Sequence, residues 1–240
     1  EGLYLNPAVP AAADYVVQGV AELLQNYPVD GIHFDDYFYP STDPAVDAVQ
    51  FAASGETDLA AWRRKNVTAL VTAVHRTVKA ADPTLRFGIS PQGNPDNDLN
   101  EQYSDVTAWL AAEGENALID YLCPQVYWGY GYTLRSGSTR FAFENIVPAW
   151  LAFPRAGEVA LYFGLGAYRI GTGDGGANAD STAVWSTGSA LAAQVQDLRS
   201  QKAGGFALYR YGSLFGPGAA DGAPAECQAL RRLTGPETVE

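Results

Sequence analysis

Strand-like apolar segments alternate with amphipathic helices five times after residue 28, and this alternation constrains the fold of the 240-residue chain more than any other feature. Parallel strands joined by helices bury both faces of a sheet, which is the organisation of α/β proteins. No repeat, linker or low-complexity tract interrupts the pattern, so residues 1–240 are expected to form a single domain. The pattern predicts strands at 29–35, 85–90, 118–128, 159–168 and 206–211, and helices at 11–27, 58–81, 102–112, 141–153, 189–202 and 225–233.

The residues at the strand ends indicate which parallel architecture to expect. No glycine-rich fingerprint lies between a strand and the next helix, so a dinucleotide-binding fold has no support. Each strand ends instead in polar and aromatic residues, as in a (β/α)8 barrel, whose site is built from the carboxyl ends of many strands. Because five strands are visible, we expect an incomplete TIM-type barrel without its first three βα units. Either those units precede Glu1 in a longer protein, or the barrel itself is incomplete.

Composition narrows the classes of partner. The net charge is −12 and the pI is near 4.5, so the surface repels nucleic-acid phosphates and anionic lipid. No apolar run is long enough to cross a membrane. The two cysteines are too few for a disulfide framework or a zinc cluster, and Cys123 is expected to be a buried free thiol. The chain begins at Glu1 and contains no methionine, so we expect a processed product or an excised fragment.

Residues 29–40, Val-Asp-Gly-Ile-His-Phe-Asp-Asp-Tyr-Phe-Tyr-Pro, predict a short strand that runs into two adjacent carboxylates. Side chains alternate between the faces of a strand, so Ile32 and Phe34 should pack under helices while His33 and Asp35 line a site. Asp36 follows where the strand gives way to a loop. Carboxylates at the carboxyl end of a strand are typical of α/β enzymes. We therefore expect Asp35 to be catalytic, and Asp36 to be its partner or a ligand of a substrate hydroxyl.

Alternative roles for these two carboxylates stay open. One of them would cap a loop, or pair with Arg63 or Arg64 of the following helix. Together with His33 they would form a metal site of a phosphoesterase or deacetylase. The second histidine, His75, lies in mid-helix and not at ligand spacing, so no metal or other cofactor is expected. We expect His33 to hydrogen-bond to Asp35 and to set its orientation and pKa.

A second strand-end carboxylate for acid/base chemistry is missing from the pattern. Glycoside hydrolysis usually needs two carboxyl groups that flank the scissile bond, and neighbouring residues on a strand point to opposite faces. Unless Asp36 reaches across a loop turn to act as the partner, the second carboxylate is expected upstream of Glu1. Four loop carboxylates are further candidates within the chain, but each is expected to be a solvated charge instead: Asp96, Asp98, Glu101 and Asp174.

Aromatic and amide side chains gather at the predicted strand ends. The C–H faces of pyranose rings pack on Trp and Tyr, while amides hydrogen-bond to sugar hydroxyls. Ordinary packing accounts equally well for any single tyrosine, but the set as a whole favours a sugar-binding surface. The expected substrate-binding residues are His33, Tyr37, Gln92, Asn94, Gln125, Tyr127, Trp128, Tyr168 and Tyr211.

The segment Val29–Pro40 resembles the signature of the glycosyl hydrolase-like ten family, a group of bacterial envelope proteins. In that family a Tyr-Leu-Asn-Pro element, present here as Tyr4–Pro7, precedes a helix and the signature strand. The matches follow the family order and are spread over about half of the chain. Further matches are Trp-Arg-Arg-Lys-Asn-Val at 62–67, Phe-Gly-Ile-Ser-Pro at 87–91 and Asp-Tyr-Leu-Cys-Pro-Gln-Val-Tyr-Trp at 120–128.

The resemblance implies a TIM-type barrel whose fourth strand is the signature strand. It also implies a glycoside hydrolase that acts on a bacterial cell-wall or related glycan, peptidoglycan included, in an extracellular or cell-envelope location. The expected partner is thus a polysaccharide or oligosaccharide, and not nucleic acid. The alternatives are a non-catalytic glycan-binding barrel and, with less support, a metal-dependent phosphoesterase or deacetylase.

Overall fold

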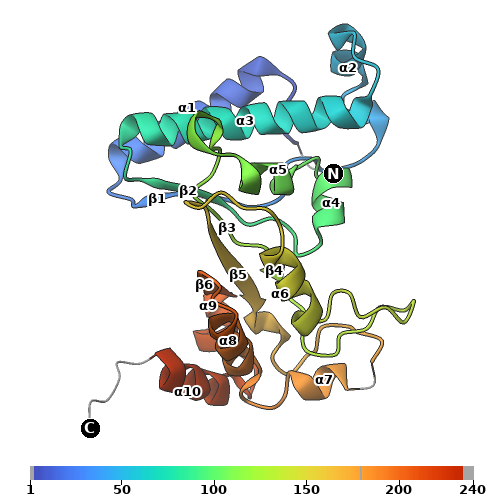
Figure 1. Cartoon of the computed structure of the whole chain (residues 1–240), viewed down its shortest axis with the longest axis vertical. Helices are drawn as coiled ribbons and strands as arrows, with labels where there is room; N and C mark the ends of the chain where they lie inside the picture. The colour runs from blue at the N-terminus through green and yellow to red at the C-terminus, as the bar shows by residue number, and fades with distance from the viewer. Residues whose placement is uncertain (1–2, 179, 235–240) are drawn as a thin grey trace. The chain divides into compact units, whose positions relative to one another are not determined.

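The structure, a computed structural model, describes residues 3–178 and 180–234. The chain divides into two compact units, which are described separately. The N-terminal unit is Glu1–Leu122 with Pro154–Ala160, and the C-terminal unit is Cys123–Phe153 with Leu161–Glu240. Figure 1 labels the helices and strands in chain order. Parallel strands alternate with helices in both units, which confirms the predicted α/β fold class.

Parallel strands form the sheet of the N-terminal unit. β1 pairs with β2, and β2 pairs with β3. The register places His33 beside Gly88, and Gly88 beside Tyr121, so these three residues lie in one row across the sheet. The strands are β1 (Gly31–Phe34), β2 (Arg86–Ile89) and β3 (Tyr121–Leu122).

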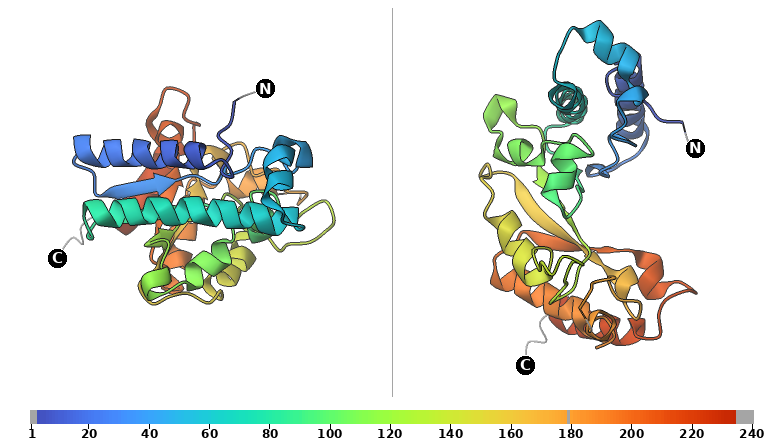
Figure 2. Two further views of the ribbon diagram at one scale, coloured as in Figure 1. Left: turned by 90° about the horizontal axis from the view of Figure 1, so that it is seen from above. Right: turned by 90° about the vertical axis from the view of Figure 1, so that its right-hand side faces the viewer.

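Two long helices, α1 (Pro10–Asn26) and α3 (Leu59–Ala81), lie side by side over one face of β1 and β2 (Figure 2). α3 begins where the Asp58 side chain accepts a hydrogen bond from the Ala61 N–H at 2.9 Å, and it ends before Pro83. Its predicted apolar stripe is buried, which confirms the helical periodicity. The buried members are Val67, Leu70, Val71, Val74 and Val78, together with Trp62.

Shorter elements complete the N-terminal unit. The Asp43-Pro44 start signal opens a single 3-10 turn, in which the Asp43 side chain accepts from the Ala45 N–H at 2.8 Å. The remaining elements are η1 (Pro44–Val46), α2 (Ala48–Ser54), α4 (Pro95–Asn100), α5 (Val106–Ala111) and η2 (Gly114–Asn116).

The C-terminal unit repeats the parallel arrangement. β5 pairs with β4 on one side and with β6 on the other. α8 packs against β6, and α10 packs against α8. The elements are β4 (Gln125–Val126), α6 (Phe143–Leu151), β5 (Ala160–Gly166), η3 (Ala167–Arg169), α7 (Ser181–Val184), α8 (Ala190–Ser200), β6 (Gly205–Tyr209), α9 (Tyr211–Phe215) and α10 (Ala223–Thr234).

Several predicted elements differ from the structure. The strand expected at 159–168 ends at Gly166, so Tyr168 belongs to η3. The strand expected at 118–128 is two short strands, because Pro124 between them has no N–H to donate to a ladder. The helix expected at 102–112 is α5 alone, and a separate helix α4 precedes it, begun by the Asn94 cap. The last strand ends at Tyr209, so Tyr211 belongs to α9. No helix among the described residues is both long and apolar enough to span a bilayer.

A buried ion pair holds the segment after β1 against α3. The Arg63 guanidinium donates to the Asp47 carboxylate through Nε at 2.8 Å, and both side chains are fully buried. Arg63 also donates to the backbone carbonyls of Thr42 and Asp43, at 3.2 and 2.9 Å. The remaining Nη1 bond goes to the Tyr103 hydroxyl at 2.9 Å. Every side of this guanidinium is therefore occupied within the fold.

Removing one partner of this pair leaves the other charge buried without compensation. We expect Asp47→Asn to lower the free energy of unfolding by about 3 kcal/mol or more. Glu56→Gln is the matched control, because the Lys65–Glu56 pair is exposed and its loss should change stability by less than about 1 kcal/mol. Urea unfolding of the three proteins measures both values. Equal effects of the two substitutions would contradict the assigned role of Arg63.

Candidate functional site

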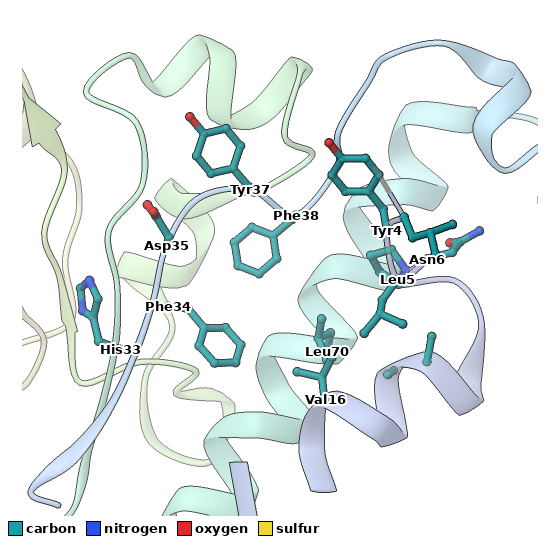
Figure 3. Close-up of a pocket in the computed structure, with 14 residues that line it drawn as sticks. Tyr4, Leu5, Asn6, Val16, His33, Phe34, Asp35, Tyr37, Phe38 and Leu70 are labelled. Carbon is teal, nitrogen blue, oxygen red and sulfur yellow. The ribbon is translucent and has the colours of Figure 1, made fainter. Parts of the chain in front are cut away.

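β1 separates apolar from polar side chains, as period-2 alternation predicts. Figure 3 shows Phe34 pointing toward Val16 and Leu70, which lie on α1 and α3, while His33 points away from them. A cavity of about 440 Å³ opens on this side, bordered by residues 3–7, α1 and the end of β1. Asp35 lies on its border, so one of the predicted catalytic carboxylates lines a cavity.

His33, Gly88 and Tyr121, which we call the N-terminal row, show how this sheet places a polar pair. The His33 Nδ1 and the Tyr121 hydroxyl are hydrogen-bonded at 2.9 Å, and the two rings stack at 5.8 Å. They belong to the first and third strands, whose backbones lie about 10 Å apart. A Cβ at position 88 would overlap the Tyr121 ring, so only glycine permits the contact. Burial is the main cause that lowers the pKa of His33, opposed by the Asp35 charge.

The Asp35 and Asp36 carboxyl groups meet just beyond the end of β1. The Asp36 N–H donates to Asp35 Oδ1 at 3.0 Å, and the two side chains are hydrogen-bonded to each other. Asp36 is buried, at 3% exposure, whereas Asp35 is exposed. Burial raises the pKa of Asp36 to about 6, and the hydrogen bond and charge of Asp35 add to the effect. The two residues do not point to opposite faces, because the strand ends at Phe34.

Two glutamines fix the backbone and side chain of Asp36. With the Gln102 amide oriented to satisfy its neighbours, its nitrogen donates to the carbonyls of Asp36 at 3.2 Å and Tyr39 at 3.0 Å. The Gln102 oxygen accepts from Gln92 Nε2 at 3.1 Å. Gln92 also hydrogen-bonds to the Asp36 side chain and thereby lowers its pKa, against the larger effect of burial. The Gln92 Oε1 accepts from Asn97 at 3.2 Å. Gln92 is thus in contact with a predicted catalytic carboxyl.

Asp98 is a further carboxyl group that sequence reasoning misplaced. It was expected to be solvated, but it is fully buried. Its Oδ1 accepts from the Gln92 N–H at 2.9 Å, while its Oδ2 has no hydrogen-bond partner. Burial, together with the charge of Asp36, raises the pKa of Asp98 to about 8. The sequence signal that could have predicted this burial is Asn94-Pro95, which marks the start of a helix. Asp98 lies one turn into that helix, α4, on its inward face. Asp96 and Glu101 are exposed, as predicted.

The other predicted residues of the N-terminal unit differ in surroundings. Asn94 caps α4, accepting from the Asp96 N–H at 3.2 Å and donating to Asn97 Oδ1 at 2.8 Å, so its local contacts are structural. Tyr37 is 77% exposed and lines the cavity. Arg63 is committed to Asp47 and is not the partner of the aspartate pair.

In the C-terminal unit, Tyr127, Gly166 and Tyr209 form a second row, the C-terminal row. Tyr127 follows β4 and lies beside Gly166 of β5, which pairs with Tyr209 of β6. The rings of Tyr127 and Tyr209 stack across the glycine at 5.7 Å. Tyr168 lies edge-on to both, at 5.5 and 6.1 Å. Tyr209 was missed as a site residue because the strand was expected to run on to Tyr211, which instead packs on Phe215.

Trp128 and Asp174 are built into the same unit. Trp128 stacks on Phe141 at 4.8 Å, and its carbonyl accepts from Gln194 at 2.9 Å. Asp174 was expected to be solvated but is buried. It accepts from the Gly129 N–H at 2.7 Å and from the Trp185 indole at 3.0 Å, which accounts for its burial. Gln125 is half-buried at the start of β4, and its role in binding stays a prediction.

Cys123 is a buried thiol outside any disulfide, as predicted, and burial raises the pKa of this thiol to about 12. In the described part of the chain, no group of three or more histidine, cysteine, aspartate or glutamate side chains is arranged to hold a metal ion.

Comparison with family models matches residues 1–180 to Glycosyl hydrolase-like 10. The chain belongs to this family. Glycosyl hydrolase YngK of Bacillus subtilis (strain 168) is 33% identical over 189 residues, which cover 70% of the chain and 35% of that relative. Glycosyl hydrolase DigH of Escherichia coli (strain K12) is 30% identical over 185 residues, covering 70% and 40%. The chain thus spans little more than a third of the length of these curated relatives.

Solved structures support the same fold for this family member. The PgaB (BpsB) glycoside hydrolase domain from Bordetella bronchiseptica matches with a TM-score of 0.58 at 16% identity, over 95% of this chain and 65% of that one. The C-terminal domain of a putative chitinase from Desulfitobacterium hafniense DCB-2 matches with a TM-score of 0.51 at 13% identity, over 94% and 75%. The resemblance and the TIM-type barrel fold inferred from sequence are therefore confirmed.

The buried Asp98 of this Glycosyl hydrolase-like 10 member gives a test by pH. Because its pKa is raised in the folded state, its contribution to stability is full below about pH 4 and is lost as the pH rises through about 8. We expect Asp98→Asn to remove this loss, on the order of 2–5 kcal/mol between pH 5 and 9. Urea unfolding at several pH values measures it. Asp96→Asn, exposed in the same helix, should follow the wild type. Parallel curves for wild type and Asp98→Asn would contradict the assignment.

Proposed function

We propose that this chain is a glycoside hydrolase acting on a bacterial cell-wall or related glycan, and that the Asp35–Asp36 pair is its acid catalyst. The observation that carries the proposal is this hydrogen-bonded pair at the end of β1, with the pKa of Asp36 raised to about 6. Membership of a glycosyl hydrolase-like family supports the reaction class. An extracellular or cell-envelope location, where such glycans lie, is part of the proposal.

The geometry supports different tasks for the two carboxyl groups. Asp35 is exposed at the cavity, so it is the group that contacts substrate and delivers a proton to the leaving oxygen as the glycosidic bond breaks. Water adds to the anomeric carbon, and the proton that this water loses returns to the pair. Asp36 is buried and keeps a proton available to Asp35 up to about pH 6. Because the groups touch each other, they act together as one acid instead of flanking the scissile bond as two separate groups. Gln92 and Gln102 hold the pair in place.

Removing either carboxyl group removes the proton donor. We expect Asp35→Asn and Asp36→Asn to reduce the release of reducing sugar from peptidoglycan glycan strands by about 100-fold or more. Asp96→Asn is the exposed control and should keep full activity. Full hydrolysis by Asp35→Asn would contradict the proposal.

A second candidate, a non-catalytic glycan-binding barrel, is favoured by the absence of a flanking arrangement in this pair. Sedimentation with insoluble peptidoglycan separates the two functions. A hydrolase releases reducing sugar and loses that release, but not its binding, in Asp36→Asn. A binding module sediments with the polymer and releases nothing.

The raised pKa also predicts how activity depends on pH. Since the pair needs its proton for catalysis, kcat/KM should fall about tenfold for each pH unit well above 6. Initial rates on soluble glycan strands from pH 4.5 to 8.5 measure this limb. Gln92→Leu removes a hydrogen bond that lowers the pKa of Asp36, so it should move the limb toward higher pH. A flat profile between pH 5 and 8 would rule out the pair as the acid.

A further inference from the structure

The C-terminal row places an aromatic surface at the carboxyl ends of β4, β5 and β6. Tyr127 and Tyr209 stack across Gly166 with an angle of 22° between their rings. Tyr209 is 52% exposed, so its ring is available to solvent as well as to its neighbours. Tyr168 closes one side, edge-on to both rings. Three tyrosines at the carboxyl ends of neighbouring parallel strands thus form a fixed platform suited to the C–H face of a pyranose.

Arg169 lies at the edge of this platform without an acidic partner. Its guanidinium is 4.6 Å from the centre of the Tyr168 ring, and its side chain hydrogen-bonds to that tyrosine. No salt bridge among the described residues includes Arg169, and its buried Nε has no hydrogen-bond partner. Among the described residues it is the one cation with an unpartnered buried nitrogen. In contrast to Arg63, which is paired with a carboxylate inside the fold, Arg169 has no carboxylate within salt-bridge distance among the described residues.

The backbone makes room for both features at the same glycine. A Cβ at Gly166 would lie 3.1 Å from Arg169 Cγ and 3.3 Å from Tyr127 Cβ. The absent side chain therefore lets the arginine stem and the tyrosine approach each other. Arg210, which follows Tyr209 at the end of β6, is exposed.

An arginine without a carboxylate partner matches one ligand chemistry. Its planar fork binds carboxylates bidentately, and one of its faces here already rests on an aromatic ring. A neutral sugar would leave this charge unpaired, whereas a sugar bearing a carboxylate would stack on the tyrosines and neutralise it. We infer that Tyr127, Tyr168, Tyr209 and Arg169 form a subsite for a carboxylate-bearing pyranose. The inference rests on the proposed function, because it assigns an acidic sugar to the glycan substrate.

The test compares two forms of one glycan. Peptide-free peptidoglycan strands carry free carboxylates, and chemical reduction converts these groups to alcohols without changing the sugar rings. Fluorescence titration of the full chain gives the Kd of each form at low salt. We expect the wild type to bind the carboxylate form about tenfold or more tightly than the reduced form. Added salt of about 0.5 M should narrow the difference, because the contact is partly exposed.

Variants locate the effect at Arg169. Arg169→Gln should lose about tenfold in affinity for the carboxylate form and leave the reduced form unchanged. Arg169→Lys, which keeps the charge without the fork, should fall between the two. Arg155→Gln removes an equal charge at an exposed position of the N-terminal unit and should bind as the wild type does. If circular dichroism shows that Arg169→Gln does not fold, the wild-type comparison of the two glycans and the Arg169→Lys variant still test the subsite.

Each outcome separates the subsite from the hydrolase. If the wild type binds both glycans with equal affinity, the subsite is overturned. The same holds if Arg169→Gln loses equal affinity for both glycans. Neither result affects the proposed hydrolysis. If the chain prefers the carboxylate form through Arg169 but releases no reducing sugar, the proposed hydrolase is overturned and the subsite is supported.

Discussion

A glycine on the middle strand of each parallel sheet is the constraint on which both cross-strand rows depend. Parallel strands keep the side chains of the first and third strands about 10 Å apart, too far for direct contact. In the N-terminal row the missing side chain lets a histidine and a tyrosine hydrogen-bond across the sheet. In the C-terminal row it lets two tyrosines stack. A glycine on the middle strand therefore permits a polar pair in one unit and an aromatic platform in the other.

The aspartate pair shows how the fold keeps a proton near neutral pH. Burial and a neighbouring carboxylate both oppose ionisation of Asp36, and the buried Arg63 does not compensate, because it is already bonded to Asp47. Amides supply the local hydrogen bonds instead, through Gln92 and Gln102. Neutral donors fix the geometry of a carboxyl group with less effect on its charge than an arginine would have. The segregation of the buried arginine from the aspartate pair thus preserves acid character.

Sequence patterns predicted the fold better than the site. Strand-helix alternation and the stripe on α3 follow from local periodicity, and both are confirmed. Predictions that depended on strand length were weaker: Pro124 divided one strand, and the end of β6 at Tyr209 left Tyr211 on a helix. Asp98 and Asp174 were misplaced because their burial depends on contacts made only in the folded chain, such as the Trp185 indole that donates to Asp174. A hydrogen bond between a buried carboxylate and a residue far away in the sequence produces no periodic pattern that could be recognised in the sequence.

The two glycine rows differ in how much change they tolerate. A methyl group at Gly88 would collide with the Tyr121 ring, so that position admits no variation while the row exists. At Gly166 the same group would meet its neighbours at 3.1 to 3.4 Å, so both Arg169 and the Tyr127 backbone would have to shift by a few tenths of an ångström. A substitution at Gly88 thus removes the His33–Tyr121 contact itself, whereas one at Gly166 changes the spacing between two stacked rings.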